Sequence, residues 1–408
     1  MIIAGLLFLV LQTILVFFRP RYFLFIYVLF YSSFLGLLPK QIIVGSYEIG
    51  FFYQNIIMLV TYFIHLKRTR KFPRYINILL ISILLFYFFG IFYPVVNGSS
   101  TILESIIGSK EFSSLFLLHF LFVNKKSISF SYIIKILSFF GYYFLLVLFV
   151  FVVFNYIPPQ YIKDMGRLQY YSPVLLSLFL FLKMSQANSQ SKKLFALLLL
   201  ALWTIGMFKE GHVAITITTT LGCFVVLYRV PIISLIKNYK RILLAFGFIG
   251  LLLIILPTRK YISDFNQIPN ISSRELYNAA RMIYIKSSPF FGYGFLYKND
   301  FSLAGNNVYN STLSVIDSGY IDLLTKFGYI GTTFFLIVLI PPFFNNHRED
   351  ILITSLKIFF LQFFAVNLTW AVFSFSMGTI ALSLAIYLTY LYNNNTKYQL
   401  ISRSLKSV

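Results

Sequence analysis

The sequence predicts an all-α polytopic membrane protein with about 12–13 transmembrane helices, each needing about 20 apolar residues, and one long outward-facing loop between late spans. Of its 408 residues, 59% are hydrophobic and only 11% are charged, whereas a soluble protein carries about 25% charged residues. The apolar runs do not alternate with polar residues as the strands of a membrane barrel do. A polar stretch from Thr258 to Phe327 separates the early runs from the last ones. Composition and run length therefore favour a bundle of helices.

The expected spans follow one another along the chain, and the longest connection between them is the 258–327 loop. They lie near residues 2–18, 22–38, 51–66, 75–95, 112–123, 132–157, 172–185, 194–208, 212–229, 242–257, 328–344, 351–374 and 376–392. The first run lacks a basic leader and a small-residue cleavage site, which predicts a retained span rather than a signal peptide. We divide the chain into a transmembrane bundle of about ten spans at 1–257, a long loop with short helices at 258–327, C-terminal transmembrane helices at 328–392 and a tail at 393–408.

The position of the charges predicts the orientation of these spans. The net charge is +22, and the basic clusters fall in short alternate connections, namely 67–74, 125–126, 192–193, 229–241 and 397–406. Because basic residues are retained on the cytoplasmic side, the N-terminus is expected outside, the C-terminal tail inside and the 258–327 loop outside. Among the acidic residues only Glu349 and Asp350 then fall inside. The single cysteine, Cys223, lies within an expected span, so neither a disulfide nor a cysteine metal site is expected.

Charged side chains reach the expected outer side at four places. They are Arg167 ahead of the 172–185 span, Lys209, Glu210 and His212 in the tight turn 207–213, Arg274 and Arg281 in the long loop, and Asp317 near its end. Arginine offers planar, bidentate donors to phosphate oxygens and stays charged. A nearby carboxylate accepts a proton from an attacking sugar hydroxyl. Together these residues are expected to bind a pyrophosphate and to support glycosyl transfer from a lipid diphosphate.

Each of these residues also has a structural interpretation. The arginines and Lys209 would serve as interfacial anchors, since long basic side chains extend to the membrane surface. His212 would be a hydrogen-bonded residue at the end of a span. Asp317 would be the N-cap of a helix that starts near Gly319. These alternatives stay open at the level of the sequence.

Two further features of the loop region give weaker signals. Asp322, one turn after Asp317, is expected on a solvated helix face. Gly292 and Gly294 have the spacing of a glycine-rich phosphate loop, but a lone G-x-G is a weak motif, and a turn is the favoured interpretation. Tyr293 between them is expected to stack on a sugar ring.

Arg274 is followed by SPFFGYG (288–294) and DSGYIDLLTKFGYIG (317–331), and GRLQYYSPVLLSL (166–178) and MFKEGHV (207–213) stand before them. These motifs resemble those of the O-antigen polymerase and O-antigen ligase superfamily. The resemblance covers most of the chain in architecture and about five dozen residues in motif. The resemblance implies a metal-independent glycosyltransferase of the bacterial inner membrane, without a cofactor, whose site faces the periplasm.

On this resemblance each candidate residue has an expected role. Arg274 and Asp317 are expected in catalysis, and Arg167, Lys209, Arg281, Glu210, His212 and Tyr293 in binding the diphosphate or glycan. The expected partners are an undecaprenyl-diphosphate-linked oligosaccharide, membrane lipid and a chain-length regulator protein, with no nucleic acid.

One departure from the family favours its polymerase branch. Ligases typically carry a histidine shortly before the final G-x-x-G span, whereas residues 258–327 contain no histidine and Asp317 stands in the comparable place. The alternatives are an O-antigen ligase that transfers the chain to lipid A core, a lipid-linked oligosaccharide flippase, and a structural membrane protein. A flippase is expected to carry cations in a central cavity, whereas the charges here gather in outer connections, and a structural role would leave the clustered outer arginines unexplained.

Overall fold

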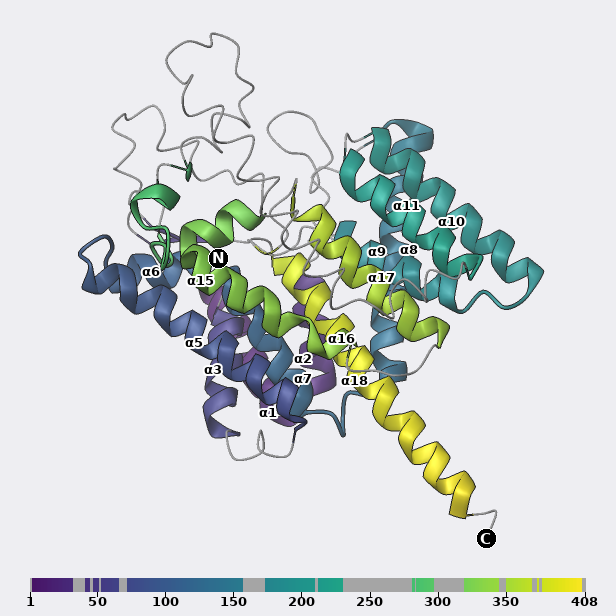
Figure 1. Ribbon diagram of the computed structural model, residues 1–408, viewed down its shortest axis with the longest axis horizontal. Coiled ribbons are helices and arrows are strands. Elements are labelled where there is room, and N and C mark those ends of the chain that lie inside the picture. The colour runs from purple at the N-terminus through teal and green to yellow at the C-terminus, as the bar shows by residue number, and fades with distance from the viewer. Residues whose placement is uncertain are drawn as a thin grey trace.

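The computed structural model describes residues 2–31, 41–44, 47–50, 53–65, 72–156, 173–209, 212–229, 281–282, 284–296, 319–344, 350–368, 373 and 376–405. These residues form 14 α-helices and one short antiparallel hairpin (Figure 1). The hairpin joins β1 (Gln41–Val44) to β2 (Tyr47–Gly50). It is a small addition to the all-α architecture that the sequence predicts.

The helices follow the expected spans closely. Their bounds are α1 Ile2–Phe18, α2 Pro20–Tyr31, α3 Tyr53–Ile64, α5 Arg74–Val96, α6 Ile102–Gly108, the 3₁₀ turn η2 Phe112–Leu115, α7 Phe116–Val123, α8 Phe130–Phe154, α9 Pro173–Ser185, α10 Gln190–Lys209, α11 Val213–Leu227, α15 Gly319–Leu339, α16 Pro341–Phe344, α17 Ile351–Val366 and α18 Ser376–Leu405. Each expected span overlaps one of them, except 242–257, which lies outside the described residues. α15 begins within the stretch assigned to the loop, and α18 continues beyond the last expected span.

Four of the described helices are long and apolar enough to cross a membrane, or five if one bent pair counts as a single span. The four segments are Arg74–Val96, Phe130–Phe154, Gln190–Lys209 and Gly319–Phe344, and the bent pair joins α6 to η2 and α7 at an angle of 61°. Five shorter apolar helices accompany them. The chain is therefore a helical multi-pass membrane protein, and the count of 12–13 spans stays a prediction.

The helices pack as two groups that α18 joins. α3 packs on α1 and α7, α2 on α1, and α5 on α15 and α6. α9, α11 and α17 pack on one another, and α8 packs on α9 and α10. α18 contacts α7 and η2 in the first group and α8, α9 and α17 in the second. Figure 1 shows α10 and α11 at one edge of the molecule and α5 and α6 at the other.

Connections that the charge pattern assigns to the cytoplasmic side meet at one end of the bundle. The Arg21 Nε donates to the carbonyl of Ser127. The Lys125 ammonium donates to the hydroxyl of Tyr390 at 3.2 Å and lies over the ring of Phe72, 5.6 Å from its centroid. These contacts join the connections after α1, before α5 and after α7 to the later part of α18.

Connections assigned to the outer side meet at the other end. The Ser376 amide donates to the Glu111 carboxylate at 3.0 Å, and the Gly319 amide donates to the carbonyl of Asn367 at 2.9 Å. α5 has 23 residues, and a helix of that length is roughly 34 Å long, which separates the two sets of contacts. These connections therefore lie at alternate ends of the helix bundle along the chain, as the positions of the basic residues predict.

Candidate functional site

A defect in α5 lies beside the segment that carries the first loop motif. Pro94 sits inside α5 and has no N–H group, so the Gly90 carbonyl four residues earlier cannot receive its helical hydrogen bond. The Phe295 amide donates to this carbonyl at 2.7 Å instead. Residues 288–296, here called the strap, are therefore joined to α5 by a bond that the helix itself cannot make.

A second defect lies in α15, where Gly328 adopts φ 61° and ψ −171° in the middle of the helix. A continuous helix would bond the Tyr329 amide to the Thr325 carbonyl and the Ile330 amide to the Lys326 carbonyl. Gly328 interrupts this ladder, so two carbonyls and two amides need other partners. Buried backbone groups are almost always paired, and the strap supplies the partners.

The strap satisfies all four interrupted groups of α15. The Tyr293 and Gly294 amides donate to the carbonyls of the interrupted ladder at 2.8 Å each. The Pro289 and Phe290 carbonyls accept from its two amides at 2.7 and 3.3 Å. The two motifs on which the family resemblance rests, 288–294 and 317–331, thus interlock backbone to backbone although they are distant in sequence.

The close approach of the two backbones explains the glycines of both motifs. Gly292 and Gly294 have φ values of 69° and 72°, which favour glycine. A Cβ on Gly292 would lie 2.6 Å from the Gly328 nitrogen, and one on Gly328 would lie 2.3 Å from the Phe290 carbonyl. The Gly292 and Gly294 amides already donate to protein carbonyls. The expected turn is confirmed, and these amides are not available to cradle a phosphate.

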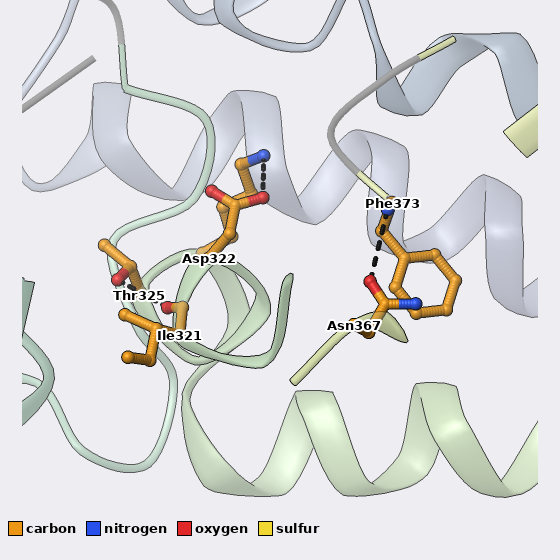
Figure 2. A network of polar contacts seen from close by, with 6 residues as sticks. Ile321, Asp322, Thr325, Asn367 and Phe373 are labelled. Carbon is orange, nitrogen blue, oxygen red and sulfur yellow. Dashed lines mark hydrogen bonds and ion pairs between the residues drawn. The ribbon is translucent and has the colours of Figure 1, made fainter. Parts of the chain in front are cut away.

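Three charged side chains gather where this region meets α15. The Lys326 ammonium contacts the Asp322 carboxylate at 2.5 Å, one helical turn apart (Figure 2). Asp322 is 1% exposed and Arg281 is 5% exposed. Burial lowers the pKa of the Arg281 guanidinium from its ordinary value, and the nearby Asp322 and Tyr284 act in the opposite direction. Two cations and one carboxylate leave one excess positive charge in this cluster.

The sequence-based expectation that Asp322 lies on a solvated face is wrong. Met282 and Ile285 form a buried apolar cluster with Ile321 and Leu324. This contact covers the first turns of α15 with the segment that precedes the strap. It brings Asp322 into a buried environment, where a carboxylate needs charged partners.

The other described acids whose side chains can be placed have a clear structural task. Glu104 forms a capping box with Thr101 at the start of α6, and Asp350 caps α17 through the Leu352 amide. Glu111 accepts from the first residue of α18. Asp322 differs from these three because it is buried within a helix and interacts with cations.

Two tyrosines flank the charged cluster. The Tyr293 hydroxyl and the Ser287 hydroxyl are hydrogen-bonded at 2.7 Å. The Tyr293 ring meets the Tyr284 ring edge to face, with 5.4 Å between centroids. Tyr284 is fully buried and Tyr293 is half-buried. Tyr293 therefore offers a partly accessible aromatic ring beside Tyr284, the tyrosine that interacts with Arg281, and its expected contact with a sugar stays a prediction.

The structure places Arg281 and Tyr293 in one segment, 281–296, which packs on α15, and it places Lys209 and His212 elsewhere. The Lys209 ammonium donates to the Phe151 carbonyl at 3.3 Å and lies over the Phe151 ring, 4.4 Å from its centroid. The His212 carbonyl accepts from the Thr216 amide at the start of α11. Figure 1 shows α10 and α11 on the right of the view and the green 281–296 segment on the left. Arg167, Glu210, Arg274 and Asp317 lie outside the described residues.

Replacing Lys209 by alanine tests whether its predicted diphosphate contact exists. Its contacts here are those of an exposed interfacial lysine, so we expect stability to fall by less than about 1 kcal/mol. If Lys209 binds the diphosphate, its replacement would also lower the affinity of the purified protein for a lipid diphosphate, measured by titration in detergent. The Lys209→Arg variant keeps the charge and is the matched control. Unchanged affinity in both variants would remove Lys209 from the site.

The sequence contains a signal for the residues that were missed. Asp322 and Lys326 are four residues apart in DLLTK, the spacing at which a helix brings an acid and a base together. Their burial depends on the packing of residues 282–285, which the helical spacing alone does not reveal. Within the described part of the chain, no group of three or more histidine, cysteine or acidic residues could hold a metal ion.

The fold and the site together define a class of protein, a helical multi-pass membrane protein with a buried, cationic cluster at one end of its bundle. Comparison with protein-family models and a search of curated proteins found no match. The geometry of the site and the motifs of the sequence therefore carry the functional argument.

Proposed function

We propose that the protein is an O-antigen-type surface-polysaccharide polymerase of the bacterial inner membrane. It joins undecaprenyl-diphosphate-linked repeat units at the periplasmic face by glycosyl transfer. The growing chain on its lipid diphosphate is the donor, and the sugar end of a new lipid-linked unit is the acceptor.

The observation that carries this proposal is the interlocking of the two motifs beside the charged cluster. The strap and residues 325–330 complete one another's backbone hydrogen bonds, so the motifs that resemble the family act as one structural unit. The unit lies next to Arg281, Asp322 and Lys326, which carry an excess positive charge. A buried cationic site favours the binding of a diphosphate, because electrostatic interactions strengthen away from water.

The proposed reaction divides these roles between the residues. The acceptor hydroxyl oxygen attacks the anomeric carbon of the donor and forms the new glycosidic bond. The bond from that carbon to the diphosphate oxygen breaks, and the lipid diphosphate leaves with the electron pair. Arg281 and Lys326, with Arg274 and Arg167 from the family resemblance, stabilise the leaving charge. Asp317 takes the hydroxyl proton in this proposal.

Deletion of the gene in its host gives the first test, read on a gel of the surface polysaccharide. A core that carries a single repeat unit, without the ladder of longer chains, is the expected result. A bare core with long lipid-linked chains accumulating would identify a ligase instead. A bare core with short units trapped inside would identify a flippase.

Replacing Arg281 by alanine is expected to reduce polymerisation by about 100-fold, the usual effect of losing one preorganised donor to a developing negative charge. The assay is the lengthening of purified lipid-linked repeat units by the reconstituted protein. Arg281→Lys keeps the charge but loses the bidentate geometry, and we expect its polymerisation activity to lie between those of the wild type and Arg281→Ala. The exposed Lys286 on the same segment supplies the matched control, Lys286→Ala. Equal activity of the two alanine variants, at equal protein levels, would contradict the role of Arg281.

A further inference from the structure

The interrupted groups of α15 have two complete sets of hydrogen-bond partners. In the structure the strap satisfies the Thr325 and Lys326 carbonyls and the Tyr329 and Ile330 amides. These same carbonyls and amides are four residues apart, so they would bond to each other if α15 became continuous. Gly328 decides between the two arrangements because it is the residue with non-helical angles inside α15.

We propose that Gly328 is a hinge that exchanges these two pairings and thereby opens the charged cluster. In the closed state, described here, the strap is docked and α15 is broken at Gly328. In the open state α15 is a continuous helix and residues 289–294 have left it. The exchange conserves the pairing of the α15 groups, and it releases the strap groups to water at the end of the bundle.

The two ends of the strap differ in how they can leave their helices. α15 restores its own ladder when the strap departs, but α5 cannot satisfy the Gly90 carbonyl because Pro94 has no N–H group. The Phe295 ring is fully buried and packs against the rings of Tyr87 in α5 and Phe112 in η2, with centroid distances of 6.3 and 5.4 Å. The strap therefore remains attached to α5 through Phe295 while its contacts to α15 exchange.

The hinge acts on the site because the charged residues lie on its two sides. Asp322 and Lys326 belong to the part of α15 before Gly328, and Arg281 belongs to the segment that leads into the strap. Straightening of α15 changes the direction of its first part relative to that segment. It separates Arg281 from Asp322 and admits a ligand to groups that are 5% and 1% exposed in the closed state. The use of this opening by a lipid diphosphate rests on the proposed function.

The first test is amide hydrogen exchange of the strap in the full-length protein in nanodiscs. Gly328→Ala favours the continuous helix, since φ 61° with ψ −171° is a conformation essentially restricted to glycine and the added Cβ would lie 2.3 Å from the Phe290 carbonyl carbon. We expect the Tyr293 and Gly294 amides to exchange at least about tenfold faster in this variant. Gly98→Ala is the control, because Gly98 also has positive φ, 67°, but no atom within 4 Å of an added Cβ. Exchange at the wild-type rate in Gly328→Ala would overturn the hinge.

A second readout in the same variant separates the exchange of pairings from simple undocking of the strap. In the open state the Tyr329 and Ile330 amides bond to the Thr325 and Lys326 carbonyls within α15, so we expect them to stay as protected in Gly328→Ala as in the wild type. If the strap only undocked, these two amides would lose their Pro289 and Phe290 partners and would exchange faster, as the Tyr293 and Gly294 amides do. Faster hydrogen exchange of the Tyr329 and Ile330 amides would therefore overturn the proposal.

The amide hydrogen-exchange measurement tests the hinge independently of the proposed function. It needs no substrate, so it decides the hinge even if the protein lengthens no lipid-linked units. If it does lengthen them, a cycle that needs both states predicts loss of activity in Gly328→Ala, with Gly98→Ala active. Full activity of Gly328→Ala would show that turnover does not need the closed state and would overturn the assigned role of the hinge.

Discussion

Replacing Asp322 by alanine is expected to destabilise the protein by about 3–5 kcal/mol, the usual cost of removing one partner from a buried ion pair. Asp322 and Arg281 are 1% and 5% exposed, and the Lys326 ammonium lies 2.5 Å from the Asp322 carboxylate. Without the carboxylate, the buried Arg281 guanidinium would lose the negative charge that lies near it. The change in free energy of unfolding is measured by denaturant titration in detergent micelles.

The charge and the shape of Asp322 can be separated by two further variants. Asp322→Asn keeps a hydrogen-bond acceptor but loses the charge, so we expect an intermediate loss of stability. Glu104→Ala is the matched control, because Glu104 is an acidic residue at the same end of the bundle. It removes a capping box from α6, which costs about 0.5–2 kcal/mol. A loss for Asp322→Ala no greater than for Glu104→Ala would show that the cluster does not depend on its carboxylate.

Polymerisation gives a second readout for Asp322. If the carboxylate keeps Arg281 and Lys326 apart and oriented, its loss should reduce activity more than the fraction of unfolded protein explains. Activity is therefore compared at equal folded protein, measured by size-exclusion chromatography before the assay. Unchanged activity per folded molecule would limit Asp322 to a structural role.

Replacing Phe295 by alanine is the second change with a large expected effect, about 3–5 kcal/mol for a fully buried aromatic ring. The Phe295 ring is 0% exposed and contacts the rings of Phe112 and Phe327. The same substitution at Phe291, which is 52% exposed, is the control and should cost less than about 1 kcal/mol. Thermal unfolding of the purified protein measures both.

The contact between Phe295 and α5 can be isolated by a double-mutant cycle with Gly90. A Cβ on Gly90 would lie 2.4 Å from the Phe295 ring, so Gly90→Ala overpacks the site and should cost about 1–3 kcal/mol. In the Phe295→Ala background the added methyl group has room, and its cost should fall close to zero. Residues in contact show such coupling, whereas distant ones add. If the losses of stability in the two single variants simply add in the double variant, the Phe295 ring does not pack against Gly90.

The helices are the part of the fold that hydropathy predicts well, and the pair α15 and α17 shows why. The apolar runs near 328–344 and 351–374 have the length and composition of buried helices, and the structure has helices there. The physical cause is local, because backbone groups in an apolar environment must be satisfied within the segment itself. The G-x-x-G at 328–331 gives no comparable local sign of the break in α15, since Gly331 is helical and Gly328 is not.

The candidate site was predictable only in part, for a related reason. The sequence named Arg281 and Tyr293, and the structure places both in the segment 281–296 that packs on α15; their role in function stays a prediction. It misplaced Asp322 because helical spacing shows which residues share a face and not what covers that face. Lys209 was grouped with the arginines because both lie at expected outer boundaries, yet α10 and the strap occupy different parts of the bundle (Figure 1).

The amino-acid sequence by itself determined a helical membrane protein, the positions of most helices and the alternation of their ends, because each follows from local hydropathy and charge. Only the tertiary structure decided that the strap completes α15 at Gly328 and α5 at Gly90, and that Asp322 is buried beside Lys326 and near Arg281. These are contacts between segments far apart in the chain. They depend on which backbone groups lack a partner after the helices have formed, and that becomes definite only when the helices pack.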